Sequence, residues 1–297
     1  MKTAIARLGL HFLAALDALW LKARERRAAR TAAATTAGAG VQSSQAINVL
    51  SFGEIAWPEF PTLAHSFWRA QELTLFRTHH GFFAEPVLDL GCGDSLFGQI
   101  AGFPKTGFGL DYDPTSLRAA KELGSSLEFI RADAGNAPLA DGSVAVCLSN
   151  SVLEHLPDLD RCFAETCRLL RPGGLFIFSM TLGSFTSQLS FWTGRRDAAF
   201  WVQRFGHVQQ PSEEELMALL SKHGFVIQER ISYQASWTTA LYRLLVSPCF
   251  QFGERRLSAS FRRRLQSRLA DRVIASLRAT GAGEGACVFV VARKNLA

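Results

Sequence analysis

The stretch Val87-Leu88-Asp89-Leu90-Gly91-Cys92-Gly93-Asp94 decides the fold of this chain of 297 residues. Its apolar beginning predicts a buried strand, which leads into a turn holding two glycines one residue apart. Glycine suits this turn because a backbone without Cβ can bend sharply and let a ligand approach its N–H groups. A second apolar stretch, Thr106 to Leu110, ends at Asp111, where a carboxylate can accept hydrogen bonds from both hydroxyls of a ribose. This order of elements predicts a nucleoside-binding half-fold.

The glycine spacing indicates which nucleoside is bound. A dinucleotide site has the pattern G-x-G-x-x-G, in which the pyrophosphate lies on the helix N-terminus. Here Leu96 occupies the third glycine position and Gly98 comes two residues later. Asp94 also places a carboxylate at the mouth of the helix, which repels a pyrophosphate and attracts an ammonium group. S-adenosylmethionine carries an ammonium group and no phosphate, so the residues favour it over NAD.

At this point the chain resembles the class I S-adenosylmethionine-dependent methyltransferases, in particular the methyltransferase-type-11 domain. The resemblance covers about residues 67–228 and returns at 286–293. It rests on consecutive blocks in the expected order: Val87 to Gly93, Gly109 to Asp113, Asp133-Ala134 with Leu139 to Val144, Ser149 to Leu156, and Leu169 to Leu175. The implied fold class is α/β, a Rossmann-like, mostly parallel sheet of seven strands with helices on both faces and the last strand antiparallel.

Apolar runs and turn residues divide the chain further. A helix is expected at about 63–80, and strands near 86–90, 106–111, 127–132, 144–149, 174–181, 225–231 and 286–293. Ser212 and Glu215 form a capping box that opens a later helix. We expect a basic helix and flexible linker over 1–44 and the methyltransferase domain over 45–297. Two insertions interrupt the domain, a lid at 182–210 and a helical segment at 233–285.

Composition limits the remaining choices. Hydrophobic residues make up 48% and charged residues 20%, which is typical of a globular chain rather than a disordered one. Six cysteines occur without a C-x-x-C pair, so we expect free thiols in a reducing compartment. The sequence predicts no metal site.

The net charge of +6 is unevenly distributed. Residues 1–30 hold seven lysines and arginines against two acids, and residues 254–278 hold eight arginines against two acids. Such basic segments favour an anionic surface, and lipid headgroups are the expected one. We therefore predict a cytoplasmic protein attached peripherally to membranes through residues 1–30 and 237–278. Packing on the body remains open for both segments, and residues 1–30 could also be a leader.

The resemblance implies a set of cofactor-binding residues. The glycine turn contacts the methionine portion through its backbone, Asp89 orients the turn or binds the ammonium group, and Asp111 holds the ribose. Tyr112 packs on adenine or is an exposed loop tyrosine, and Asp133 accepts from the adenine amino group or stabilises a turn. The full set is Asp89, Gly91, Cys92, Gly93, Asp94, Asp111, Tyr112, Asp133, Ala134 and Asn150.

Catalytic residues are less evident. The sulfonium is an activated methyl donor, so a base is required only for an alcohol or a similarly weak acid. His155 and His207 are candidates for that base, each with a structural role as the alternative. Trp68, Arg69 and Glu72, in the leading helix, either face the cofactor or belong to ordinary helix packing.

The function predicted on these grounds is methyl transfer from S-adenosylmethionine to a small-molecule acceptor, with lipid-linked and glycan acceptors as examples. A non-catalytic cofactor-binding or scaffolding relative of the same fold is the alternative. An NAD-dependent oxidoreductase is disfavoured by the displaced third glycine. Nucleic acid is not an expected partner, because Ser149-Asn150-Ser151-Val152 stands where an Asn/Asp-Pro-Pro-Tyr motif would follow the fourth strand. The oligomeric state stays open.

Overall fold

The computed structural model of the protein describes residues 62–254 and 285–296. Seven strands form one sheet: β1 (Val87–Leu90), β2 (Gly107–Asp111), β3 (Glu128–Arg131), β4 (Val144–Asn150), β5 (Leu170–Thr181), β6 (Phe225–Tyr233) and β7 (Cys287–Lys294). The helices are α2 (Leu63–Thr78), α3 (Leu96–Ala101), α4 (Pro114–Glu122), α5 (Leu159–Leu169), α6 (Gly183–Thr193), α7 (Arg195–Phe205), α8 (Glu213–Lys222), α9 (Ser236–Leu245) and α10 (Pro248–Glu254). Two 3-10 turns, η3 (His80–Phe82) and η4 (Leu153–His155), complete the described elements.

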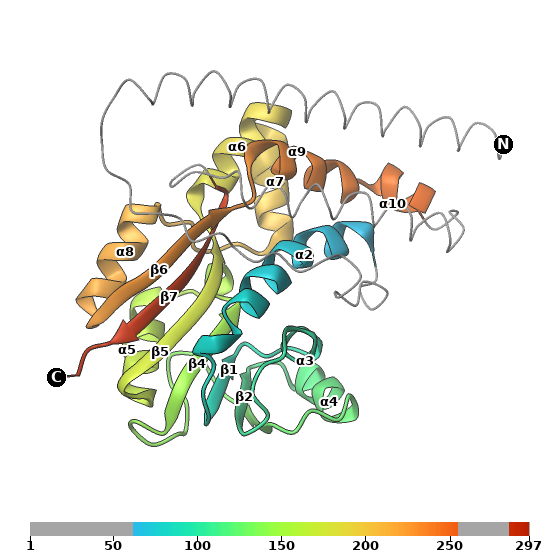
Figure 1. Cartoon of the computed structure of the whole chain (residues 1–297). Helices are drawn as coiled ribbons and strands as arrows, with labels where there is room; N and C mark the ends of the chain where they lie inside the picture. Colours follow the sequence, from blue (N-terminus) through green and yellow to red (C-terminus); the bar gives the residue numbers. More distant parts are fainter. Residues whose placement is uncertain (1–61, 255–284, 297) are drawn as a thin grey trace.

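The sheet has the order β3-β2-β1-β4-β5-β7-β6 (Figure 1). The first five strands in sequence run parallel, whereas β7 lies between β5 and β6 and is antiparallel to both. The chain order reverses between β1 and β4, and ligands of open α/β sheets bind beyond the carboxyl ends of the strands at such a switch point. The predicted fold class is confirmed.

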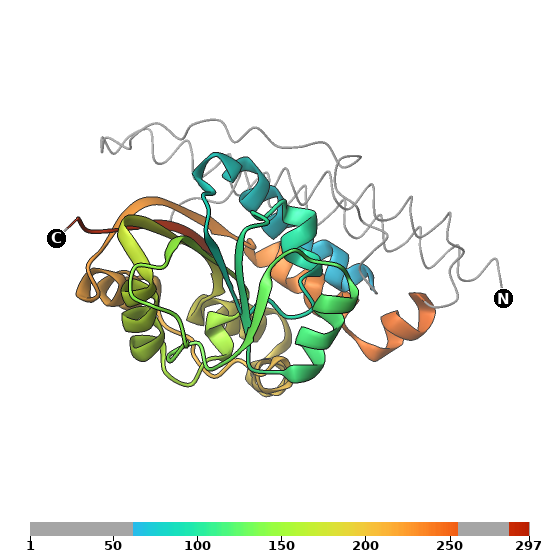
Figure 2. The same ribbon diagram turned by 90° about the horizontal axis from the view of Figure 1, so that it is seen from below.

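Helices cover both faces of the sheet, with α2 on one side and α5 and α8 on the other (Figure 2). Alternate strand residues supply the two apolar clusters, as the pleat of a strand requires. Val146 and Leu148 of β4 pack with α2, while Cys147 between them packs with α5. Strands buried on both faces explain why the sequence shows continuous apolar runs rather than an alternating pattern.

Close contact between β1 and β2 depends on Gly107, the first residue of β2. Its φ of +145° is one that L side chains rarely adopt. A Cβ at this position would lie 2.0 Å from the carbonyl oxygen of Val87. The backbone of β1 therefore occupies the space that any side chain here would need.

One strand boundary differs from the prediction. The fifth strand was predicted to begin at Gly174, after Pro172-Gly173. Instead α5 ends at Leu169 and β5 begins at Leu170, which pairs with Val144. The register shifts before the next pair, Val146 with Leu175, so the extra residues bulge out at the glycines. Other expected strands lie within a few residues of their predicted positions, and the capping box is confirmed.

Both predicted insertions contribute helices that pack against one another. The 182–210 insertion forms α6 and α7, and the described part of 233–285 forms α9 and α10. Trp68 of α2 contacts the rings of Phe185 in α6 and Tyr242 in α9, at centroid distances of 5.8 and 4.5 Å. Leu241 and Leu245 of α9 belong to the apolar cluster. The described part of the 237–278 segment thus includes a packed helix, which was one of the two interpretations of that segment.

The predicted helix and linker of residues 1–44 lie outside the described residues, and so does nearly all of the basic segment 254–278. Within the part that the structure describes, no helix is both long and apolar enough to span a membrane.

Candidate functional site

The glycine turn follows β1 at the carboxyl edge of the sheet. Gly91 and Gly93 have φ values of +72° and +54°. A Cβ on Gly91 would lie 2.5 Å from the side chain of Val152, so this glycine is required by space as well as by conformation. The Gly91 and Cys92 amides donate to the carbonyl oxygen of Leu110, at 2.7 and 3.0 Å, and this fixes the turn against β2.

Asp111 lies directly beside this turn. Its Oδ2 accepts from the Gly93 amide and its Oδ1 accepts from the Asp113 amide, both at 2.9 Å. A carboxylate has about four lone-pair sites, so these two bonds orient it and leave acceptor capacity for ligand hydroxyls. The glycine turn and the acid expected to hold the ribose are therefore brought together, as predicted.

Asp89 is buried at the end of β1, 5% exposed. Burial, and secondarily the charge of Asp111, raises the pKa of Asp89 to about 7. A buried carboxylate that is costly to ionise is stabilised by a nearby cation. The ammonium group expected for this position would supply that charge.

The other two residues of the turn have local structural roles. Cys92 is buried, 8% exposed, and its burial raises the pKa of the thiol. Asp94 accepts from the Leu96 amide at 3.1 Å, across the first turn of α3. Gly98, the displaced third glycine, lies in α3 where a Cβ would approach Asp89 Oδ2 to 3.0 Å, so it allows the close approach of helix and strand.

Tyr112, Asp133 and Ala134 lie near the same edge of the sheet. The Tyr112 side chain is 77% exposed, which agrees with the exposed-loop interpretation. Asp133 Oδ1 accepts from the Gly135 amide at 2.7 Å, so this aspartate stabilises a turn. That turn follows β3, whose continuation is tied to Asp111 by the bond from the Ala132 amide to the Asp111 carbonyl oxygen, 3.2 Å.

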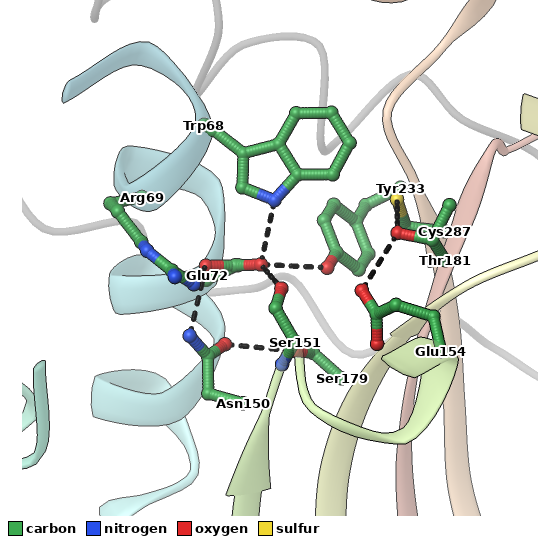
Figure 3. A network of polar contacts seen from close by, with 10 residues as sticks. All are labelled: Trp68, Arg69, Glu72, Asn150, Ser151, Glu154, Ser179, Thr181, Tyr233 and Cys287. Carbon is green, nitrogen blue, oxygen red and sulfur yellow. Dashed lines mark hydrogen bonds and ion pairs between the residues drawn. The ribbon is translucent and has the colours of Figure 1, made fainter. Parts of the chain in front are cut away.

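A polar network that the sequence did not predict is centred on Glu72 of α2, whose side chain is fully buried (Figure 3). Trp68 Nε1 donates to its Oε1 at 2.9 Å, and Arg69 pairs with its Oε2 at 2.5 Å. From the sheet, Asn150 Nδ2 donates to Oε2 at 3.0 Å and the Ser151 hydroxyl donates to Oε1.

Further bonds join the network to neighbouring strands. Tyr233 Oη, at the end of β6, donates to Glu72 Oε1 at 3.3 Å. Ser179 Oγ of β5 donates to Asn150 Oδ1 at 2.7 Å. Asn150, assigned to the cofactor by resemblance, thus also holds α2 against the sheet. The spacing of Trp68, Arg69 and Glu72 on one helical face was the available sequence signal, but their partners are distant in the chain.

A cavity of about 130 Å³ adjoins the network. It is bounded by α2, the 182–210 insertion, α9 and the segment after β4, and the residues at its wall include His65, Trp68, Arg69, Phe185, Phe205 and Tyr242. His155 and His207 also line it, with ring centroids 5.3 Å apart. The two candidate bases are therefore brought to one cavity, although only the tertiary structure places them side by side.

The sheet order and the junction of the glycine turn with Asp111 are those of the class I methyltransferase fold. Residues 88–178 match the family model described as a methyltransferase domain. Over this stretch the chain is similar to the methyltransferase domain family.

Relatives carry the same description. The chain is 38% identical over 130 residues to an uncharacterized methyltransferase of Mycobacterium sp. strain KMS, covering 41% of this chain and 51% of the relative. A second match, 29% identical over 174 residues, is to a "Probable S-adenosylmethionine-dependent methyltransferase" of Mycolicibacterium smegmatis, covering 58% of this chain and 64% of that protein. The chain spans about half the length of the first of these relatives.

Solved structures share the fold. The geranyl diphosphate C-methyltransferase of Streptomyces coelicolor A3(2), in complex with Mg²⁺, geranyl diphosphate and S-adenosyl-L-homocysteine, matches with a TM-score of 0.54 at 14% identity. The match covers 86% of this chain and 93% of that protein. A geranyl diphosphate methyltransferase in complex with S-adenosylmethionine matches with a TM-score of 0.52 at 16% identity, covering 84% and 96%.

Proposed function

We propose that the protein is an S-adenosylmethionine-dependent methyltransferase that acts on a small-molecule acceptor. The observation that carries this proposal is the 2.9 Å bond between the Gly93 amide and Asp111 Oδ2. This bond joins the glycine turn after β1 to the carboxylate at the end of the neighbouring strand β2. A nucleoside bound at this edge of the sheet would contact both the turn and the carboxylate. The methyltransferase names of the relatives support the same conclusion.

In this proposal different residues bind different parts of the cofactor. Asp111 accepts from the ribose hydroxyls, and Asp89 with the backbone of Gly91 and Gly93 holds the methionine end. The adenine is bordered by Asp133, Ala134 and Tyr112. Their positions near one another are supported by the bond from the Ala132 amide to the Asp111 carbonyl oxygen. Cys92 contributes to the turn next to the ligand, and the Asp94 carboxylate, which accepts one bond from the Leu96 amide, keeps acceptor capacity for the ammonium group.

The cavity of about 130 Å³ is the proposed acceptor site. Aromatic side chains from α2, α6, α7 and α9 form part of its wall and restrict access of water. Restricted access of water and in-line placement of the acceptor are most of what methyl transfer from a sulfonium requires. The 182–210 insertion forms part of this wall, which supports its proposed role as a lid. A cavity of this size suits a small acceptor, and solved proteins of the same fold are named as methyltransferases of a small molecule, geranyl diphosphate.

Calorimetry with S-adenosyl-L-homocysteine tests the proposal. We expect binding by the wild type and its loss in Asp111→Ala and in Gly93→Asp, which adds a carboxylate to the turn. The control Asp141→Asn removes a carboxylate that pairs with Arg168 at the surface and should bind normally. No binding by the folded wild type would refute the proposal. Cofactor binding without formation of S-adenosyl-L-homocysteine from S-adenosylmethionine, with any of a broad panel of acceptors, would favour the non-catalytic relative.

Peripheral attachment to an anionic membrane is a separate proposal. Exposed apolar side chains on α9 and α10, Leu244 at 45% and Phe252 at 60%, support it together with the basic composition of 1–30 and 254–278. The full chain should pellet with phosphatidylserine vesicles, and less so as salt rises. Failure to pellet at low salt would contradict attachment.

A further inference from the structure

Three potential metal ligands converge at the cavity wall. Glu154 and His155 lie in η4, directly after β4, and His207 follows α7 in the insertion. One ligand atom from each lies within 4.8 Å of the others. Metal–ligand bonds of about 2.0–2.2 Å separate two ligands of one ion by up to about 4.4 Å, so small side-chain rotations bring these three onto a common ion.

The two histidines are arranged as ligands. His155 Nδ1 lies 3.0 Å from the carbonyl oxygen of Gly206, and a proton on Nδ1 that is donated to this oxygen leaves a lone pair on Nε2. A backbone carbonyl in this position is the usual outer partner of a metal-bound imidazole. His207 Nδ1 is buried and has no hydrogen-bond partner among the described residues.

Glu154 supplies a buried carboxylate. The residue is 1% exposed, and its Oε1 accepts from Thr181 Oγ1 at 3.0 Å (Figure 3). Its Oε2 is buried without a hydrogen-bond partner in the described part of the chain. A buried carboxylate oxygen without a partner is costly, and a bound cation removes that cost. A structural role in packing alone would leave both this oxygen and the His207 nitrogen unexplained.

We propose that Glu154, His155 and His207 bind a divalent transition-metal ion on one face, with the remaining coordination positions open to the cavity. Two imidazoles and one carboxylate suit Zn²⁺, Fe²⁺, Co²⁺ or Mn²⁺ better than Ca²⁺. The sequence alone predicted no metal site, because its cysteines form no C-x-x-C pair and the histidines were considered only as candidate bases.

The open positions give the ion a role that rests on the proposed methyl transfer. An oxygen of the acceptor can bind there, and the ion lowers the pKa of a bound hydroxyl. The hydroxyl proton passes to water, the oxygen forms a bond to the methyl carbon, and the carbon–sulfur bond breaks with its electron pair remaining on sulfur. The ion thus takes the place of the general base for which His155 and His207 were candidates.

Titration of the metal-free, untagged full chain with Co²⁺, followed by visible absorption and equilibrium dialysis, tests the site. We expect one equivalent bound at this site, with affinity reduced at least about tenfold in His155→Ala, His207→Ala and Glu154→Gln. His155 is exposed, so its replacement should leave the fold intact. The control His80→Ala removes an exposed histidine of η3 and should bind as the wild type does.

Calorimetry with S-adenosyl-L-homocysteine on the same samples separates the two proposals. Cofactor binding by protein that takes up no Co²⁺, or that takes it up equally well in His155→Ala and His207→Ala, would overturn the metal site alone. If the wild type binds Co²⁺ through these residues but does not bind S-adenosyl-L-homocysteine, the proposed function alone is overturned.

Discussion

Glu72 Oε2 lies 3.0 Å from Asn150 Nδ2, which joins the middle of α2 to the last residue of β4 across 78 positions of the sequence. The same carboxylate pairs with Arg69, whose side chain is 25% exposed. A fully buried carboxylate surrounded by donors from α2, from β4 and the residue after it, and from β6 fixes the position of α2 over the carboxyl edge of the sheet. Because α2 also forms a wall of the cavity, this contact couples the stability of the domain to the shape of the proposed acceptor site.

Glu72→Gln should destabilise the domain by about 3 kcal/mol, because it keeps the volume but breaks a buried ion pair and weakens charge-assisted hydrogen bonds. Urea unfolding measures the difference. Glu122→Gln, an exposed change near the end of α4, is the matched control and should remain within about 0.5 kcal/mol of wild type. Equal effects of the two substitutions would show that the network contributes nothing specific.

Asp89→Asn should change the pH dependence of stability. The folded protein binds a proton at Asp89 up to about pH 7, whereas the unfolded chain releases it near 3.8. The folded wild type therefore holds this proton more tightly than the unfolded chain between about pH 4 and pH 7. Its free energy of unfolding falls as the pH rises through this range, because the unfolded chain releases the proton and gains in stability relative to the folded protein. The variant carries no charge at this position. Its free energy of unfolding relative to that of the wild type should therefore rise by a few kcal/mol between pH 5 and pH 8.

Urea unfolding at both pH values measures this gain. The same variant should bind S-adenosyl-L-homocysteine more weakly, because the ammonium group loses its partner. A stability difference that is the same at pH 5 and pH 8 would contradict the assigned pKa of Asp89.

Gly107→Ala should prevent stable folding or cost more than about 4 kcal/mol, because its Cβ would lie 2.0 Å from the Val87 carbonyl oxygen between β1 and β2. Gly124→Ala is the control. Its φ of +78° is also unfavourable for alanine, but nothing lies within 4 Å of the added Cβ, so the cost should be about 1 kcal/mol. Thermal unfolding distinguishes the two, and similar losses would mean that backbone conformation alone sets the cost at Gly107.

Four buried cysteines should resist alkylation in the native protein. They are free thiols, as the sequence predicted, and burial raises the pKa of each, that of Cys162 to about 12. The thiolate is the reactive form, so iodoacetamide at pH 8 should modify Cys92, Cys147, Cys162 and Cys287 only after unfolding. Cys167, which is half-buried, provides an internal comparison and should react sooner. Peptide mass spectrometry measures each rate, and rapid native labelling of Cys147 would contradict its burial.

Local signals made the fold predictable. Apolar runs located the strands to within a few residues, and Ser212 with Glu215 located the start of α8. The glycines beside Asp111 indicated the nucleoside edge, because a turn of positive φ and a strand-terminal acid are both properties of a few adjacent residues. The early start of β5 was missed, since the pairing of Leu170 with Val144 depends on a neighbouring strand.

The sequence by itself determined the order of the elements, the α/β class and the residues of the glycine turn, because strand periodicity and backbone conformation are set by residues close together in the chain. Only the tertiary structure decided that Glu72 would hold Asn150, and that His207 would meet Glu154 and His155. A buried polar side chain takes its partner from whichever segment packing brings within about 3 Å. The spacing of residues along the chain does not predict this partner when the two segments belong to different elements.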